Sequence, residues 1–211
     1  MRICQLQRKR KIIEVRRLSI ILVFALFGLQ KHWAQDTCSV QQSPSALNLR
    51  TNLLHDLLLT PNLGIEWPLD SCWTLLNCGS FAWWSDNSRH RYWRVAIGEM
   101  ELRRYFGRKG NHHFGLYAAV YRYDFEFGAT GYQAHLNYGA GLNYGYFIRL
   151  NRRLGLDLSL GLGYLGGIFK QYEPNRDAYY WTERKRLTYF GPTRLESTLV
   201  WRLGHRKGGA R

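Results

Sequence analysis

The feature that most constrains the fold is a strict two-residue alternation over residues 154–164. Leucine or tyrosine stands at every even position there, and glycine, aspartate or serine stands at every odd position. A period of two belongs to a β-strand with two unlike faces. Residues 136–150 repeat the pattern, with Phe147 as the one apolar exception on a face that also carries Arg149. The sequence therefore predicts two long strands, each with one tall apolar face.

Gly161, Gly163 and Gly166 match the G-x-G-x-x-G pattern of a dinucleotide-binding turn. That turn follows a buried parallel strand, which appears as a continuous apolar run, and it opens a helix. Here an alternating strand precedes the glycines, and the sequence that follows, IFKQYEPNRD, has no helical period. We therefore interpret the glycines as the small face of a strand and expect neither a nucleotide nor any other cofactor.

The chemistry of the small face separates two kinds of sheet. In a soluble sheet the polar face meets water and favours Lys, Glu, Thr and Arg, whereas glycine and small polar residues suit a crowded enclosure. The apolar face ends in aromatic residues, as on the wall of a transmembrane barrel with a polar interior. We expect an all-β fold, an eight-stranded antiparallel transmembrane β-barrel of the up-and-down type with both termini in the periplasm.

The rest of the chain divides into strands by the same pattern. The expected strands are residues 47–54, 62–69, 72–84, 91–106, 112–127, 134–150, 153–171 and 188–203. A turn is expected at 55–61 and a long loop at 172–187. The strand 91–106 alternates least well, and we expect a bulge near Gly98. On the strand 112–127 we assign Tyr117 and its odd-numbered neighbours to the outer face.

The N-terminus has the order of a secretory signal. A basic segment at 8–17 precedes an apolar run at 18–29, which is too short for a transmembrane helix, and small Ala34 offers a cleavage site. We expect a signal peptide at 1–34, a periplasmic segment at 35–45, the barrel at 46–204 and a basic tail at 205–211. An uncleaved anchor is the alternative. The expected location is the outer membrane of a Gram-negative bacterium.

The charge of the chain points to lipid rather than to nucleic acid. The formal net charge is +15, from 30 Lys and Arg against 15 Asp and Glu. Removing residues 1–34 takes away eight basic and one acidic residue, which leaves 22 minus 14, or +8. The remaining excess suits outer-membrane lipid headgroups and lipopolysaccharide, or is the ordinary arginine of loops and rims. No nucleic acid partner is expected.

The cysteines give no metal site. Cys4 lies in the signal, and Cys38, Cys72 and Cys78 show no ligand spacing. Cys72 and Cys78 lie on one strand, roughly 20 Å apart, and cannot form a disulfide with each other. A bond between Cys38 and Cys72 at the periplasmic end stays open.

Several stretches resemble a known family. They are LRTNLLHDLLLTPNLGIEWPL, FAWWSDNSRHRYWR, EMELRRYFG, YDFEFGATGYQ, LGLGYLGG and YFGPTRLESTLVW, which together span about 46–204. The chain resembles small outer-membrane β-barrels of Bacteroidota that are grouped only as a domain of unknown function. The resemblance implies an outer-membrane barrel whose genes often lie near fimbrial subunit genes, and hence a fimbrial or other surface protein as a partner. It implies no activity. The tail HRKGGAR departs from common barrel endings, which finish on an aromatic residue.

Charged residues are predicted to line the interior. They are Arg50, Glu66, Glu99, Glu101, Arg103, Arg122, Asp124, Glu126, Asp157, Arg194 and Glu196. An eight-stranded barrel is just wide enough for side chains to fill it. We therefore expect an ion-paired plug, with a pathway for protons or small ions as the alternative.

The outer rim is predicted to carry a binding surface. Its candidate residues are Trp84, Arg89, His90, Arg91, Trp93, Tyr132 and Gln133. Exposed Trp, Tyr and Arg are the residues that anchor interfaces, although a belt of interfacial aromatics is the plain alternative. We expect a non-enzymatic accessory or docking protein for a cell-surface structure, with no metal. The alternatives are a purely structural barrel and a lipid-modifying enzyme that uses Ser85, Asp86, His90 and His135.

Overall fold

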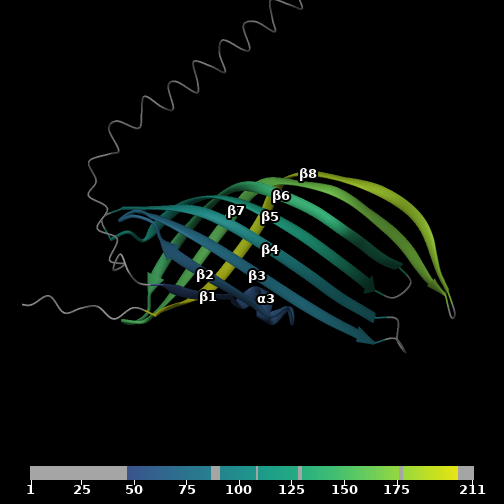
Figure 1. Ribbon diagram of the computed structural model, residues 1–211, viewed down its shortest axis with the longest axis horizontal. Coiled ribbons are helices and arrows are strands. Elements are labelled where there is room, and N and C mark those ends of the chain that lie inside the picture. Colours follow the sequence, from purple (N-terminus) through teal and green to yellow (C-terminus); the bar gives the residue numbers. More distant parts are fainter. Residues whose placement is uncertain (1–46, 87–90, 108, 128–129, 176–177, 204–211) are drawn as a thin grey trace, which may run out of the picture. The chain divides into compact units, whose positions relative to one another are not determined.

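A computed structural model describes residues 47–86, 91–107, 109–127, 130–175 and 178–203. They form eight antiparallel strands in chain order, and the first strand pairs with the last to close a barrel (Figure 1). The predicted eight-stranded up-and-down barrel is therefore confirmed. The segments expected at 1–34, 35–45 and 205–211 lie outside the described residues, as does Cys38.

Most strands lie where the alternation predicts them. They are β1 (Asn48–Asn52), β2 (Asn62–Pro68), β3 (Trp73–Asp86), β4 (Arg91–Phe106), β5 (His112–Phe127), β6 (Thr130–Arg149), β7 (Leu154–Asn175) and β8 (Ala178–Arg202). A short helix, α3 (Leu53–Leu57), joins β1 to β2 where a simple turn was expected. The Asn52 side chain caps this helix by accepting a hydrogen bond from the Leu54 amide at 3.1 Å.

The predicted long loop at 172–187 is wrong. β7 continues to Asn175 and β8 already begins at Ala178, so that Tyr172 pairs with Trp181 and Lys170 with Arg184. Apolar alternation does not predict this part of β8, because both faces of its run TERKR are polar.

The predicted bulge near Gly98 is also wrong. β4 pairs with β3 and β5 through Gly98 without a change of register, and the nearest shift lies between Tyr121 and Tyr123, where β5 meets β6. Val95 shares a face with Glu101 and Arg103 because all three point inward, and all three are buried. The inner face changes its chemistry along the strand, so that no bulge is needed to explain the mixed pattern.

The face assignment of β5 must be reversed. Tyr117 is 2% exposed and pairs with Glu101 of β4 on the inner face. Arg122, Asp124 and Glu126 have the opposite parity, which they share with outward-facing Phe114. Both faces of β5 carry large apolar residues, so alternation alone does not say which face is inside.

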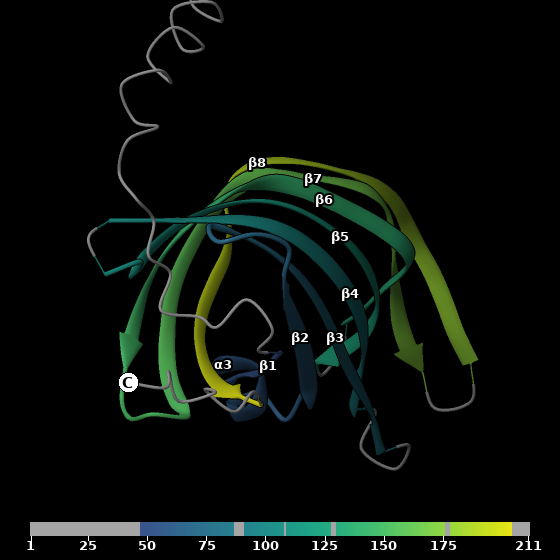
Figure 2. The same cartoon turned by 60° about the vertical axis from the view of Figure 1, so that its left-hand side comes forward.

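The ring of strands is complete over only part of its height. β1 pairs with β8 from Thr198 to Arg202, and β2 pairs with β3 from Thr74 to Ser80. We call the part level with these pairs the closed section. β3 continues beyond Ser80 and β8 extends back from Ser197 to Ala178, and we call this part, with the neighbouring ends of β4–β7, the open section (Figure 2).

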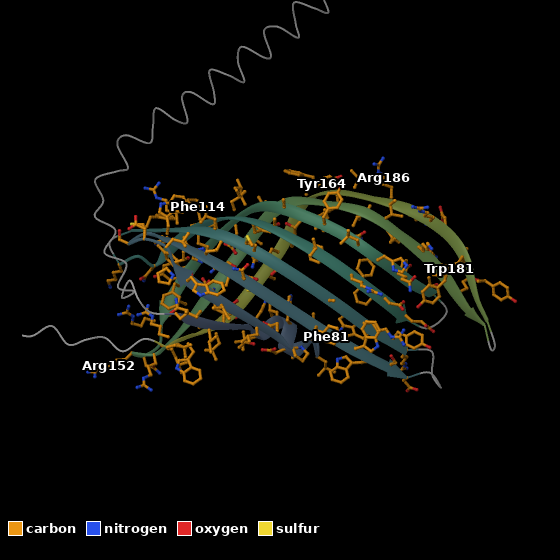
Figure 3. The ribbon with its side chains drawn as sticks, viewed as in Figure 1. Phe81, Phe114, Arg152, Tyr164, Trp181 and Arg186 are labelled. Carbon is orange, nitrogen blue, oxygen red and sulfur yellow. The ribbon has the colours of Figure 1, made fainter. Side chains whose placement is uncertain are left out.

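The outer face carries a band of exposed apolar side chains. Its members are between 51% and 66% exposed and include Leu63, Phe114, Leu116, Leu142, Leu160, Leu162 and Leu195. Phe114 and Tyr164 project from the outside of the sheet in Figure 3. The interior, by contrast, holds fully buried Glu66 and Arg103. No helix in the described part of the chain is long and apolar enough to cross a membrane.

Candidate functional site

The first candidate site is a cluster of charged side chains inside the closed section and at its boundary with the open section, where Arg194 and Glu196 lie. Inner positions of five strands supply it: Arg50 from β1, Glu66 from β2, Glu99, Glu101 and Arg103 from β4, Asp157 from β7, and Arg194 and Glu196 from β8. We call these eight residues the lumen cluster. Three of the predicted interior charges, Arg122, Asp124 and Glu126, lie on the other face of β5 and are not members.

One half of the lumen cluster is centred on Asp157. Arg50 pairs with Asp157 and also donates to Glu66 at 2.8 Å. Asp157 accepts further bonds from Arg103 at 2.8 Å and from the His113 ring at 2.9 Å. Each of these side chains is at most 2% exposed. Water is therefore replaced by protein donors around both carboxylates.

The other half is centred on Glu101. Arg103 lies 2.9 Å from Glu101, and Arg194 also pairs with Glu101. Arg194 reaches Glu196 at 2.8 Å and Glu99 at 3.4 Å. Because Arg103 contacts both Glu101 and Asp157, it joins the two halves into one network that ties together β1, β2, β4, β7 and β8.

Neutral donors complete the shell of the carboxylates. Glu66 accepts from Thr74 and from Tyr105, each at 2.7 Å. Asn143 donates to Glu101 at 3.0 Å, and Ser159 donates to Glu196 at 3.0 Å. Buried charges are tolerated only when their hydrogen bonds are satisfied in this way. No sequence pattern predicts Tyr105 or His113 as members, since only the strand register brings them here.

Glycines on β6 and β7 make room for the largest interior side chains. The Tyr117 hydroxyl bonds Thr193, and the Arg194 guanidinium lies 5.2 Å from the Tyr117 ring centre. A Cβ added at Gly161 would lie 2.8 Å from the Arg194 side chain, and one at Gly163 would collide with the backbone of Ala140. The G-x-G-x-x-G motif thus lies within β7 and serves packing.

The helix α3 covers the lumen cluster at the base of the open section. His55 shares a hydrogen bond of 3.1 Å with Ser80, and burial lowers the pKa of His55. The space beside them, which Arg50, Glu99 and Glu196 also line, measures only about 10 Å³. That is room for a single water at most. The Ser–His pair therefore has no room for a substrate.

The second candidate site is a pocket of about 720 Å³ at the ends of β3 and β4, which we call the rim pocket. Its lining is Trp83, Trp84, Ser85, Asp86, Arg91, Tyr92, Trp93 and Glu126. Three predicted binding residues, Trp84, Arg91 and Trp93, meet here. Arg89 and His90 lie outside the described residues.

The other predicted rim residues lie elsewhere. Gln133 lines a separate pocket of about 200 Å³ together with Arg94 and His135. The Tyr132 ring lies 6.2 Å from that of Phe169 on the neighbouring strand. Ser85 accepts bonds of 2.9 and 3.0 Å from Arg94. Ser85 and His135 therefore line different pockets, and the structure does not bring this nucleophile and base together.

The carboxylates Asp124 and Glu126 form a polar group of their own near the rim. Tyr172 donates to Asp124 at 2.8 Å and to Glu126 at 3.4 Å. Arg94 lies 3.6 Å from Asp124. This group connects β4, β5 and β7 outside the lumen cluster.

Comparison with known families places the chain. A family model described as a protein of unknown function, DUF3575, matches residues 20–203. The chain belongs to the DUF3575 family. The match covers every strand of the barrel. The predicted resemblance to a domain of unknown function is confirmed at this level. Neither a curated protein nor a solved structure matches the chain.

Proposed function

We propose that this DUF3575 protein is a non-enzymatic outer-membrane β-barrel that acts as an accessory or docking protein for a structure on the cell surface. The observation that carries the membrane assignment is the exposed apolar band around a buried, charged interior. Exposed apolar area costs about 25 cal/mol per Å² in water. Lipid removes that cost, and a band of this kind around a polar interior is typical of outer-membrane barrels.

The tryptophans support a membrane interface at each end of the barrel. Trp67, Trp73 and Trp201 lie near the chain ends and short turns, and each is between 36% and 49% exposed. Trp83 lies on the outer face near the other end of β3, beside the rim pocket, and is 51% exposed. Amphipathic rings prefer the two membrane interfaces. The proposed periplasmic termini also agree with export by an N-terminal signal.

The lumen cluster supports a barrel that does not conduct. Its ion pairs cross the interior from β1 and β2 to β4, β7 and β8, and Arg103 at the junction is fully buried. An ion would have to break several paired, desolvated contacts to pass. We expect planar-bilayer recordings of the intact barrel to show no steady conductance, and large stable channels would contradict this part of the proposal.

Heat modifiability and fractionation test the membrane assignment. The natively extracted protein should be recovered with the outer membrane, and unboiled and boiled samples should migrate differently on a gel. The first and last strands pair to close the barrel, so the folded ring is expected to persist in an unboiled sample. Equal migration, or recovery in the soluble periplasm, would contradict the assignment.

The rim pocket is the proposed docking surface. Trp84 and Trp93 offer large rigid rings and Arg91 offers a cation, and such residues carry most of the energy at interfaces. The expected partners are a fimbrial or other surface protein, or lipopolysaccharide. The double variant Arg91→Ala, Trp93→Ala should retain heat modifiability while it loses most binding to lipopolysaccharide vesicles or to co-purifying surface proteins.

The other end of the barrel provides a matched control. Arg153 and Trp201 line a pocket of about 670 Å³ beside the turn at 150–153. The variant Arg153→Ala, Trp201→Ala removes the same two residue types and should leave binding unchanged. The docking proposal fails if both double variants bind equally. A change in lipid A on gene deletion that Ser85→Ala alone reproduces would favour the enzyme instead.

A further inference from the structure

The inner face of β4 and β5 changes from charged to aromatic along the barrel. Glu99, Glu101 and Arg103 of β4 give way, at the same inward parity, to Ile97, Val95 and Trp93. On β5 the inward positions beyond Tyr117 are Tyr121, Tyr123 and Phe125. The Phe125 ring lies 4.8 Å from Trp93 and 4.9 Å from Tyr123. The open section therefore has an aromatic inner face.

The outer face changes in the opposite direction. On β5 the outward residues run from Phe114 and Leu116 to Arg122 and Asp124. Other outward residues at this height are Arg94, Gln133, Lys170, Arg184 and Arg186. Figure 3 shows Arg186 pointing away from the sheet. The inward aromatic residues of β4 and β5 are thus not part of the lipid-facing wall, whereas Phe81 and Trp83 of β3 point outward.

Several of these inward aromatic side chains are only partly covered. Trp84 is 52% exposed, and Tyr189 of β8 is 41% exposed. Tyr132 and Phe169 lie 6.2 Å apart across β6 and β7. A face of half-exposed aromatic rings gains free energy when an apolar ligand covers it.

The barrel wall is too short on one side to cross a membrane. β1 has five residues and β2 has seven. A membrane-spanning strand needs about 9–11 residues. The outward residues of β8 stay apolar beyond the last pair with β1, at Leu195 and Phe190, which are 66% and 80% exposed. The opening between β3 and β8 therefore begins at the height of the lipid-facing band.

The segment from α3 to β2 borders this opening and presents leucines. Leu57, Leu58 and Leu59 are 79%, 57% and 70% exposed. The same segment is tied to the aromatic inner face, because the Trp84 indole donates to the Leu59 carbonyl at 2.6 Å and the Trp93 indole donates to the Thr60 hydroxyl at 3.0 Å. These leucines therefore connect the lipid side to the aromatic face.

We infer that the opening between β3 and β8 admits an acyl chain of a membrane lipid sideways onto the aromatic inner face of the open section. The inference rests on the proposed membrane insertion. The leucines provide an apolar entrance, Trp84, Trp93 and Phe125 provide the contact surface, and α3 with the lumen cluster provides a closed floor. A lipid chain fits these features because it reaches the opening from within the bilayer and needs no polar partner along its length.

Photo-cross-linking tests the inference. The full-length protein is inserted into phosphatidylcholine vesicles whose lipid carries a diazirine at the end of one acyl chain, and labelled residues are mapped by mass spectrometry. Labels are expected on the outer band, at Leu142 or Leu160, and also on the inner face, at Trp93 or Phe125. Outer labels alone would overturn the inference and leave the membrane assignment standing. Absence of both would overturn both.

Adjacent tryptophans of β3 give a matched pair of variants. Trp83 and Trp84 are 51% and 52% exposed but point to opposite faces. Trp84→Ala should lower inner labelling several-fold relative to the outer labels, whereas Trp83→Ala should leave the ratio unchanged. Both variants are first checked for heat-modifiable migration. Equal ratios would overturn the inference, as would inner labelling by a water-soluble diazirine probe but not by the lipid.

Discussion

β4 and β5 run through both the closed and the open section, and their inner face has opposite chemistry in the two. On β4, the inward residues are Arg103 and Glu101 in the closed section, and Val95 and Trp93 toward the open section. The closed section surrounds its charges with strands on every side, so that each carboxylate finds donors. The open section lacks β1 and β2, and isolated charges there would have fewer partners. On β4 and β5, the inner face therefore carries charges where strands enclose it and aromatic residues where they do not. On β8 the inward residues Glu183 and Lys185 of the open section form an ion pair of 2.8 Å that is about half exposed.

The two sections should therefore respond differently to substitution. A side chain in the closed section contacts neighbours from several strands, as Arg103 does through Glu101 and Asp157. A side chain in the open section is partly exposed, as Trp84 is, and its loss leaves no cavity sealed from solvent. Stability is expected to depend on the closed section and ligand contact on the open section.

The largest effect is expected for Arg103→Ala. Removing the central cation leaves Glu101 and Asp157 short of a buried partner, at a cost of about 3–5 kcal/mol in the free energy of unfolding. Arg104→Ala is the matched control, because Arg104 points outward and lies over the Trp73 ring at 5.8 Å. Its cost should be about 1 kcal/mol or less. Urea unfolding in lipid vesicles measures both, and equal costs would refute the plug.

The second prediction compares two inward aromatic residues of β5. Tyr117 is 2% exposed in the closed section, whereas Phe125 is partly exposed in the open section. Tyr117→Ala should cost about 3 kcal/mol or more, because it leaves a cavity between strands that cannot close. Phe125→Ala should cost about 1 kcal/mol. The same unfolding assay decides, and a larger loss for Phe125 would reverse the proposed division between the sections.

The sequence predicted the strands well because alternation is local. The alternation of residues 154–164 can be recognised from that segment alone, without knowledge of its neighbouring strands. The face of β5 could not be read in the same way, since Tyr117 and Leu116 are both apolar and only pairing with β4 and β6 shows which is inside. Alternation does not predict the extension of β8 to Ala178 because both faces of the run TERKR are polar.

The sequence predicts many of the residues of the lumen cluster, but not which of them form pairs. Arg50 and Asp157 were both expected inside, but their contact joins residues 107 apart in the chain. The strand register brings His113 and Tyr105 into the interior, and the helix α3 brings in His55. No hydrophobic period in the sequence predicts either. Residues of the rim pocket were found because Trp84 and Trp93 lie close together in the sequence on one hairpin.

The third prediction concerns the space around two glycines of the barrel wall, Gly141 and Gly79. A methyl group at Gly141 would collide with the Leu162 carbonyl and with Gly163, which are backbone atoms that cannot rotate away. Gly141→Ala should therefore cost about 1–3 kcal/mol through overpacking. Gly79→Ala is the control, since nothing lies within 4 Å of its added methyl group. The temperature at which the folded gel band disappears should fall for the first variant only, and an equal shift would show that strand propensity, rather than interior space, sets the need for glycine.

The smallest effect is expected at the boundary between the sections, where α3 lies outside the strands. Burial is the largest cause that lowers the pKa of His55, and nearby Arg194 lowers it further, whereas Glu196 and Asp56 oppose this. Above the ordinary histidine pKa of about 6.5, the folded and unfolded chains both hold His55 neutral. Below it, the unfolded chain takes up a proton that the folded chain resists, so stability is lost as the pH falls.

His55→Gln keeps a neutral side chain at every pH and leaves the other histidines unchanged. The stability of the wild-type protein relative to this variant should therefore decrease between about pH 7.5 and about pH 5.5. The unfolding assay in lipid vesicles, run on both proteins at both pH values, measures this difference. Protonation of His55 places a cation on a buried ring near Arg194, so α3 should loosen and acyl-chain labelling of Phe125 should rise at the lower pH. A difference that stays constant or increases would show that the imidazole of His55 is solvated in the folded protein and that α3 does not seal the floor of the open section.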